Sequence, residues 1–180
     1  MAVIINASTS TGLVQSADTS GIIQFQSNGS TKATLNSSGF SYPGGVIQVV
    51  SAVFTSNTST TSTSFVQATT TATITPQFST SKIYIMVSGP SYSGSVNYAI
   101  STLYRNNTTN LGSAGYSGLG ITGNNPGTYD TSVAFNYLDS PNTTSATTYT
   151  VYIKSNGGGT AYWGDNGAIP STITLMEIAA

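Results

Sequence analysis

The chain has 180 residues, of which 38% are hydrophobic and only 5% are charged, and its net charge is −1. This length suits one domain with a short appendage. Globular proteins ordinarily carry about 25% charged residues. Serine and threonine make up about a third of this chain, so they must form much of its surface. The chain has no cysteine and no histidine, which excludes zinc, copper and iron–sulfur sites of the usual kind and histidine-based catalysis. Its four basic residues are too few to bind nucleic acid. No apolar run approaches the ~20 residues of a membrane span.

Residues 1–44 are predicted to form an N-terminal anchoring arm or stem. The clearest signal in them is Asn28-Gly29, which lies between two strand-like stretches. Asn-Gly permits positive φ at both central positions of a turn, so a β-hairpin is predicted. A second turn is expected at residues 38–39, and residues 42–45 are a break. Because a lone hairpin is marginally stable in water, the arm needs partners, either copies of itself or the surface of another protein.

Residues 46–180 are predicted to form an all-β head domain. Seven stretches are rich in β-branched and aromatic residues, mostly with period-2 alternation, and clusters of Gly, Pro, Asn and Ser bound them. They are Val46–Phe54, Ser64–Ile74, Lys82–Val87, Tyr98–Arg105, Ser132–Leu138, Tyr149–Lys154 and Thr172–Ile178. Short strands at this spacing indicate an antiparallel β-sandwich of the jelly-roll kind. Thr favours extended backbone, so a strand face can be wet without many charges.

Long loops rich in glycine and serine are predicted between the strands. The longest is residues 106–129, and the others are residues 88–95 and 155–160. The glycines of residues 118–123 have the spacing of a dinucleotide-binding motif, but Asn-Asn-Pro-Gly follows where that motif requires a helix. A flexible loop is therefore the preferred interpretation, and neither a cofactor nor a metal is expected.

Five carboxylates are too few to predict an active site. Asp130 and Asp139 end a predicted strand on opposite sides, about 25 Å apart if the strand is straight, which is too far for the carboxylate pair of a glycosidase. Asp139 is typical of a turn residue that accepts hydrogen bonds from backbone N–H groups. Glu177 lies in an apolar strand, which predicts an edge or interface carboxylate. The sharper alternative places it near a symmetry axis, paired with Arg105 or Lys82 of a neighbouring copy.

Four aromatic residues are expected on or near loops. They are Tyr116, Tyr129, Tyr162 and Trp163. Exposed rings surrounded by Asn and Ser suit stacking on sugars or contacts with protein, and they equally suit packing between subunits. Both interpretations stay open.

Two stretches near the C-terminus carry the most specific likeness to a known group of proteins. They are residues 137–149, Tyr-Leu-Asp-Ser-Pro-Asn-Thr-Thr-Ser-Ala-Thr-Thr-Tyr, and residues 171–178, Ser-Thr-Ile-Thr-Leu-Met-Glu-Ile. Shorter matching stretches are Val46–Val50, Ile74–Pro76, Ser81–Ser88 and Leu103–Arg105. On these residues, 46–180 resembles the C-terminal β domain of structural proteins of tailed phages, of the tail-fibre and capsid-decoration type. Residues 18–29 are similar to the stem and anchoring segments that precede such domains.

The resemblance implies a non-enzymatic, usually homotrimeric protein on the exterior surface of a virion. Three arms could bury the apolar faces of Ile22, Ile23, Phe25 and Leu35 against each other, or dock those faces on a phage capsid or tail protein. Since the chain is one head with a short arm, capsid decoration or cementing is the favoured role. The alternative is a short tail fibre or spike that binds a host surface glycan; a depolymerising enzyme is disfavoured because the acidic residues are not clustered.

Overall fold

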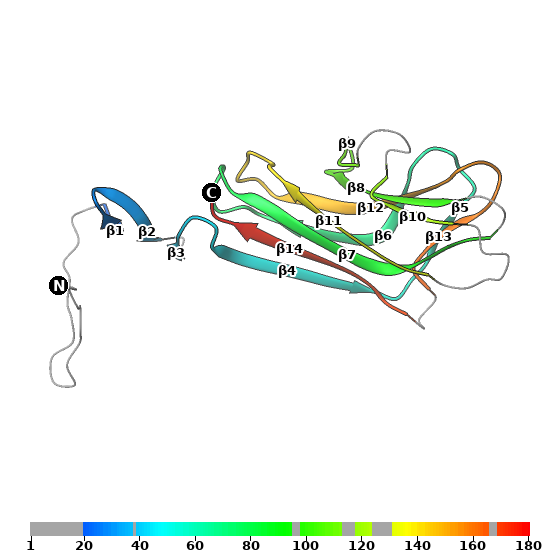
Figure 1. Cartoon of the computed structure of the whole chain (residues 1–180), viewed down its shortest axis with the longest axis horizontal. Helices are drawn as coiled ribbons and strands as arrows, with labels where there is room; N and C mark the ends of the chain where they lie inside the picture. Colours follow the sequence, from blue (N-terminus) through cyan, green and yellow to red (C-terminus); the bar gives the residue numbers. More distant parts are fainter. Residues whose placement is uncertain (1–19, 38, 95–97, 113–117, 124–130, 166–168) are drawn as a thin grey trace. The chain divides into compact units, whose positions relative to one another are not determined.

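The computed structural model describes residues 20–37, 39–94, 98–112, 118–123, 131–165 and 169–180. The chain divides into an N-terminal unit, residues 1–43, and a C-terminal unit, residues 44–180 (Figure 1). In the described ranges every regular element is a β-strand, and all strand pairs are antiparallel. The predicted all-β fold is confirmed. No helix among these residues is long and apolar enough to cross a membrane.

The N-terminal unit contains a three-stranded sheet in the order β1 (Ile23–Ser27), β2 (Ser30–Asn36) and β3 (Gly39–Ser41). Asn28 and Gly29 connect the first two strands with φ values of 50° and 74°, as a two-residue hairpin turn of the mirror-image type requires. The predicted hairpin is confirmed. A third strand was not expected, and it begins at Gly39, whose φ of 113° suits glycine.

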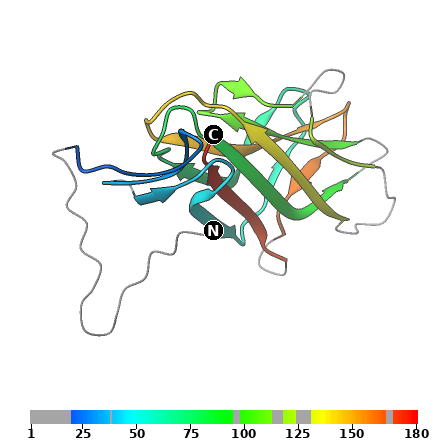
Figure 2. The same ribbon diagram turned by 60° about the vertical axis from the view of Figure 1, so that its left-hand side comes forward.

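The C-terminal unit is built from two sheets that face each other (Figure 1, Figure 2). The five-stranded sheet has the order β10-β8-β12-β6, with β9 paired to β8, and the six-stranded sheet has the order β4-β14-β7-β13-β5, with β11 paired to β7. The strands are β4 (Val46–Phe54), β5 (Thr58–Thr60), β6 (Val66–Ile74), β7 (Lys82–Ser93), β8 (Ala99–Arg105), β9 (Thr109–Asn110), β10 (Gly120–Thr122), β11 (Thr131–Asp139), β12 (Thr147–Ser155), β13 (Ala161–Trp163) and β14 (Ser171–Ile178). This arrangement agrees with the predicted antiparallel β-sandwich.

The predicted loops differ most from the structure. All seven predicted strands are present, but β7 continues to Ser93 and so includes most of residues 88–95, which were predicted as a loop. The stretch predicted as the longest loop contributes β9 and β10, and β13 follows directly on the predicted loop at 155–160. Strands of two or three residues have no periodicity to detect in a sequence, because alternation needs at least four residues to be recognised.

The core of the sandwich lies between the two sheets and follows the period-2 pattern. In β14, buried residues alternate strictly with partly exposed ones from Ser171 to Ile178. The inner faces supply one continuous hydrophobic cluster: Ala68, Ala72, Ile74, Ile83, Ile85, Val87, Leu103, Leu111, Val133, Phe135, Tyr149, Val151, Ile153, Trp163, Ile173 and Leu175. Alternation puts successive side chains on opposite faces, so the same strands also define two outer faces.

The C-terminal unit has two distinct ends. At one end Gly44 N–H donates to the carbonyl of Ala179, and Ala179 N–H donates to the carbonyl of Gly45, at 2.8 and 2.9 Å. The chain therefore enters this unit beside its last residues. The short strands β5 and β13 lie at the opposite end (Figure 1).

Candidate functional site

One face of the N-terminal sheet is apolar and exposed. Ile23, Leu35 and Phe40 form one row across the three strands. The ring of Phe40 lies 5.9 Å from that of Phe25 and 6.1 Å from that of Tyr42, centroid to centroid. Phe25 and Phe40 are 46% and 55% exposed. The face is therefore a set of touching apolar side chains that none of the described residues of this unit covers.

The opposite face of this sheet is polar. Gln24 and Gln26 point to it and bond side chain to side chain at 3.1 Å. Of the four residues predicted for the arm, the structure brings Ile23, Phe25 and Leu35 onto the apolar face, whereas Ile22 precedes β1 and does not belong to the row. Sequence reasoning missed Phe40 and Tyr42, although their i, i+2 spacing after a turn is the signal of a strand with one apolar face.

The outer face of the six-stranded sheet also exposes more apolar side chains than a face in contact with water usually does. Its central part consists of three rows across β4, β14, β7 and β11. The rows are Val53-Thr172-Ser88-Ala134, Ser51-Thr174-Met86-Asn136 and Val49-Met176-Tyr84-Leu138. None of these twelve side chains is charged. Val49, Val53, Met86 and Leu138 are exposed large hydrophobic side chains, which an antiparallel sheet normally keeps on its buried side.

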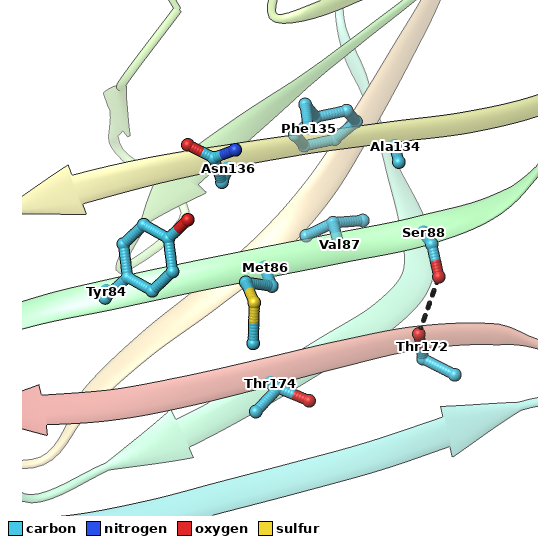
Figure 3. A pocket seen from close by; sticks show the side chains of 9 residues that line it. All are labelled: Tyr84, Met86, Val87, Ser88, Ala134, Phe135, Asn136, Thr172 and Thr174. Carbon is cyan, nitrogen blue, oxygen red and sulfur yellow. Dashed lines mark hydrogen bonds between the residues drawn. The ribbon is translucent and has the colours of Figure 1, made fainter. Parts of the chain in front are cut away.

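A hollow of about 410 Å³ lies in this face (Figure 3). Its side chains come from β7, β11 and β14. Small residues form one row of it, and Ser88 and Thr172 bond through their hydroxyl groups at 2.9 Å. Thr174, Met86 and Asn136 form the next row of its lining. Tyr84 is the titratable residue among those that line the hollow.

The outer face of the five-stranded sheet is different in character. Threonine pairs bond across β6 and β12, Thr71 with Thr150 at 2.8 Å and Thr73 with Thr148 at 2.7 Å. Beside them Tyr152 stacks on Tyr104 at 4.1 Å. Cross-strand hydroxyl pairs of this kind stabilise the sheet; the Thr73–Thr148 pair is exposed, whereas Thr150 is fully buried.

Of the four aromatic residues predicted to be exposed on or near loops, the structure describes Tyr162 and Trp163. The prediction for Trp163 is wrong: the side chain is fully buried, its indole N–H donates to Thr70 Oγ1 at 2.9 Å, and its ring lies 5.9 Å from that of Phe135. The reason is that β13 pairs with β7 and β5, so its side chains alternate and every second one points inward. Tyr162 points outward and stacks on Tyr92 at 4.1 Å. Tyr116 and Tyr129 lie outside the described residues.

The prediction that Glu177 is an edge or interface carboxylate is also wrong. β14 has β4 on one side and β7 on the other, and Glu177 is fully buried. Its Oε1 accepts hydrogen bonds from the backbone N–H groups of Gln77 and Phe78 at 2.8 and 3.3 Å, and its Oε2 accepts one from Gln48 Nε2 at 2.5 Å. The carboxylate thus ties the connection between β6 and β7 to the central strand.

Arg105 has a partner in its own chain. Its Nη1 donates to both carboxylate oxygens of Asp139 at 2.8 Å, and Tyr149 Oη donates to Asp139 Oδ2 at 2.7 Å. The predicted pairing of Arg105 with Glu177 is replaced by this cluster, and Asp139 ends β11 as a buried residue rather than capping a turn. The cluster links the two sheets, because β11 belongs to one and β8 and β12 to the other.

This cluster predicts a pH dependence of stability. Burial first, and then the hydrogen bond to Asp139, raise the pKa of Tyr149 above its usual range near 10. Above about pH 10 the unfolded chain loses this proton while the folded chain keeps it, so the free energy of unfolding should fall by about 1.4 kcal/mol per pH unit. Below pH 10 the contribution is complete. Urea unfolding between pH 8 and pH 11 measures the slope, which Tyr149→Phe should reduce and Tyr98→Phe, at an exposed tyrosine, should not.

No protein-family model matches the chain, and no curated protein is similar to it in sequence. Among the residues that the structure describes, no group of three or more acidic side chains could hold a metal ion. The two apolar faces are therefore the surfaces from which a function can be argued.

Proposed function

We propose that this protein is a non-enzymatic structural protein on the exterior of a tailed-phage virion, a homotrimer that decorates the capsid and is anchored through its N-terminal unit. The observation that carries the proposal is the exposed apolar face of the N-terminal sheet, with Phe25, Leu35 and Phe40. The likeness of residues 137–149 and 171–178 to phage structural proteins supports the same role.

The apolar face supports anchoring because its exposure is costly in water. Full burial of a Leu or Phe side chain contributes about 1.5–3 kcal/mol, so the exposed side chains of this face together offer several kcal/mol per copy to any surface that covers them. A contiguous set of exposed apolar side chains of this kind is typical of a contact surface. Other copies, a capsid protein or both would cover it.

The C-terminal unit supports an outward orientation of the head. The chain enters this unit at Gly44 and Gly45, beside the last residues, and the β5 and β13 end lies opposite. A unit attached at one end leaves its other end toward solvent. Its hydroxyl-rich, nearly uncharged surface is compatible with solubility while avoiding the desolvation of ions at contacts.

A short tail fibre or spike that binds a host surface glycan is the second candidate. The stacked pair of Tyr92 and Tyr162, which lies at the end away from the chain entry, favours it. Because Trp163 is buried, Tyr162→Ala is the variant that tests this function. A loss of adsorption to host cells would support glycan binding, and unchanged adsorption would count against it.

The proposed anchoring is tested with the double substitution Phe25→Ser and Phe40→Ser in the full chain. Removing two half-exposed rings should weaken binding to phage particles that lack the protein by about 10- to 150-fold, since about 1.5–3 kcal/mol of apolar burial is lost. Gln24→Ser with Thr34→Ser, on the opposite face of the same sheet, is the matched control. Co-sedimentation with particles measures occupancy, and equal saturation by both double variants would contradict the proposal.

A further inference from the structure

The core of the sandwich is open along one of its three long edge strands. β4, β6 and β11 each have nine residues, and among the described strands each has a neighbour on one side only. All four inward side chains of β6 are buried, and so are three of the four on β11. On β4, at the margin of its sheet (Figure 1), the inward side chains all remain partly exposed: Gln48, Val50, Ala52 and Phe54.

The exposure of these inward residues comes from the free side of β4. Val50 and Ala52 pair with Leu175 and Ile173 of β14, and both of those partners are fully buried. Burial is therefore complete one strand further in, and what β4 lacks is a neighbour beyond it. An added strand supplies this, because it covers the side chains and also pairs with the outward N–H and C=O groups of the edge.

The sequence of β4 is that of an interior strand. Val49 and Val53 on its outward face are 54% and 63% exposed, so both faces of the strand carry apolar residues, a pattern typical of strands with neighbours on both sides. Natural edge strands are usually short or carry charges, Pro or bulges. β4 has neither charge nor Pro, and its register shift lies at its start, before Gln48. Residues 48–54 are therefore a regular apolar edge, which is typical of a strand that pairs with another chain.

We infer that β4 pairs antiparallel with β4 of a second copy about a two-fold axis. The regular run 48–54 is centred on Ser51, so the register that pairs all seven residues sets Ser51 opposite Ser51. Val49 then faces Val53, and Val50 faces Ala52, so inward side chains meet inward ones and each copy closes the open core of the other. A two-fold axis brings every charge near the axis close to its own copy, and like charges opposite each other are destabilising; β4 has none. The contact is isologous, the commonest kind between identical subunits.

This contact goes beyond the proposed function. In the proposed homotrimer it joins a head of one trimer to a head of another, so it adds a link between neighbouring copies on the particle. The apolar face of the N-terminal sheet takes no part in it.

Single cysteines on the three long edge strands test the inference in the full chain, which has no cysteine of its own. Residues opposite each other in antiparallel strands have Cα atoms about 4.5–5.5 Å apart, within the ~4.4–6.8 Å of a disulfide. Ser51→Cys should therefore give covalent dimers on a non-reducing gel after mild oxidation. Thr73→Cys on β6 and Asn136→Cys on β11, both at exposed positions, are the matched controls and should dimerise at least ten-fold more slowly. Monomers from Ser51→Cys, or equal rates for the three variants, would overturn the inference, whether the edge is then open or covered by a different segment.

A charge at the axis gives a second readout that needs no disulfide. Ser51 is exposed, so Ser51→Lys leaves the core intact and sets two positive charges opposite each other. Native mass measurement should show the assembly falling to half its mass in Ser51→Lys and unchanged in Thr73→Lys; an unchanged mass in both would contradict the contact. The Phe25→Ser and Phe40→Ser double variant should still cross-link through Cys at position 51, so loss of particle binding and loss of the head contact are told apart.

Discussion

Replacing Trp163 with alanine should lower the free energy of unfolding by about 3–5 kcal/mol, as truncation of a buried tryptophan does. The side chain is fully buried between the sheets, and its indole N–H donates to Thr70 Oγ1. It also packs on the backbone of β7, because a Cβ built on Gly89 would lie 3.1 Å from the indole ring. Alanine would leave a large cavity at this point and remove the hydrogen-bond donor.

Urea unfolding followed by tyrosine fluorescence and circular dichroism measures this effect. Trp163→Phe separates the two causes, since it keeps most of the volume and loses only the N–H donor, so its cost should be clearly smaller. Tyr162→Ala, the neighbouring outward residue, is the surface control and should cost less than Trp163→Ala. Equal costs for the variants at 162 and 163 would contradict the buried position of the indole ring.

Glu177→Leu should destabilise the protein by about 3 kcal/mol even though leucine is apolar and the site is fully buried. The carboxylate accepts hydrogen bonds from two backbone N–H groups, those of Gln77 and Phe78. Each donor left without an acceptor in the interior costs about 1–3 kcal/mol. Relief from burying a charge offsets part of this loss.

Glu177→Gln is the control for this prediction. Its amide oxygen can still accept from Gln77, while its NH₂ group faces Gln48, which already donates to Thr75, so a smaller loss of about 1–2 kcal/mol is expected. Hydrogen exchange gives the local signature: the amides of Gln77 and Phe78 should lose protection in Glu177→Leu and keep most of it in Glu177→Gln. Unchanged protection in Glu177→Leu would show that the carboxylate does not hold this connection.

Trp163 and Glu177 were both expected at the surface or at an interface. The same physical reason accounts for both errors. A residue's burial depends on how many strands flank its own strand and on which side of the sheet the second layer packs. Neither is encoded locally, because β13 and β14 acquire their neighbours from strands far away in the chain.

The cluster of Arg105, Asp139 and Tyr149 is another case in which the local sequence pattern predicts the wrong partners for a side chain. Asp139 is followed by Ser-Pro, and that local pattern favours a turn cap. Its partners come from β8 and β12 in the other sheet, and only the packing of the two layers brings them together.

The sequence by itself determined the class of fold, the seven long strands, the Asn28-Gly29 hairpin and most of the apolar row on the N-terminal sheet. Alternation of apolar and polar residues and the φ preference of Asn-Gly act within a few residues, so they can be recognised without a structure. The tertiary structure alone decided the short strands, the partners of the buried carboxylates and the uncharged outer face of the six-stranded sheet that carries a hollow. These depend on long-range strand pairing, which sets side chains distant in sequence beside one another on one surface.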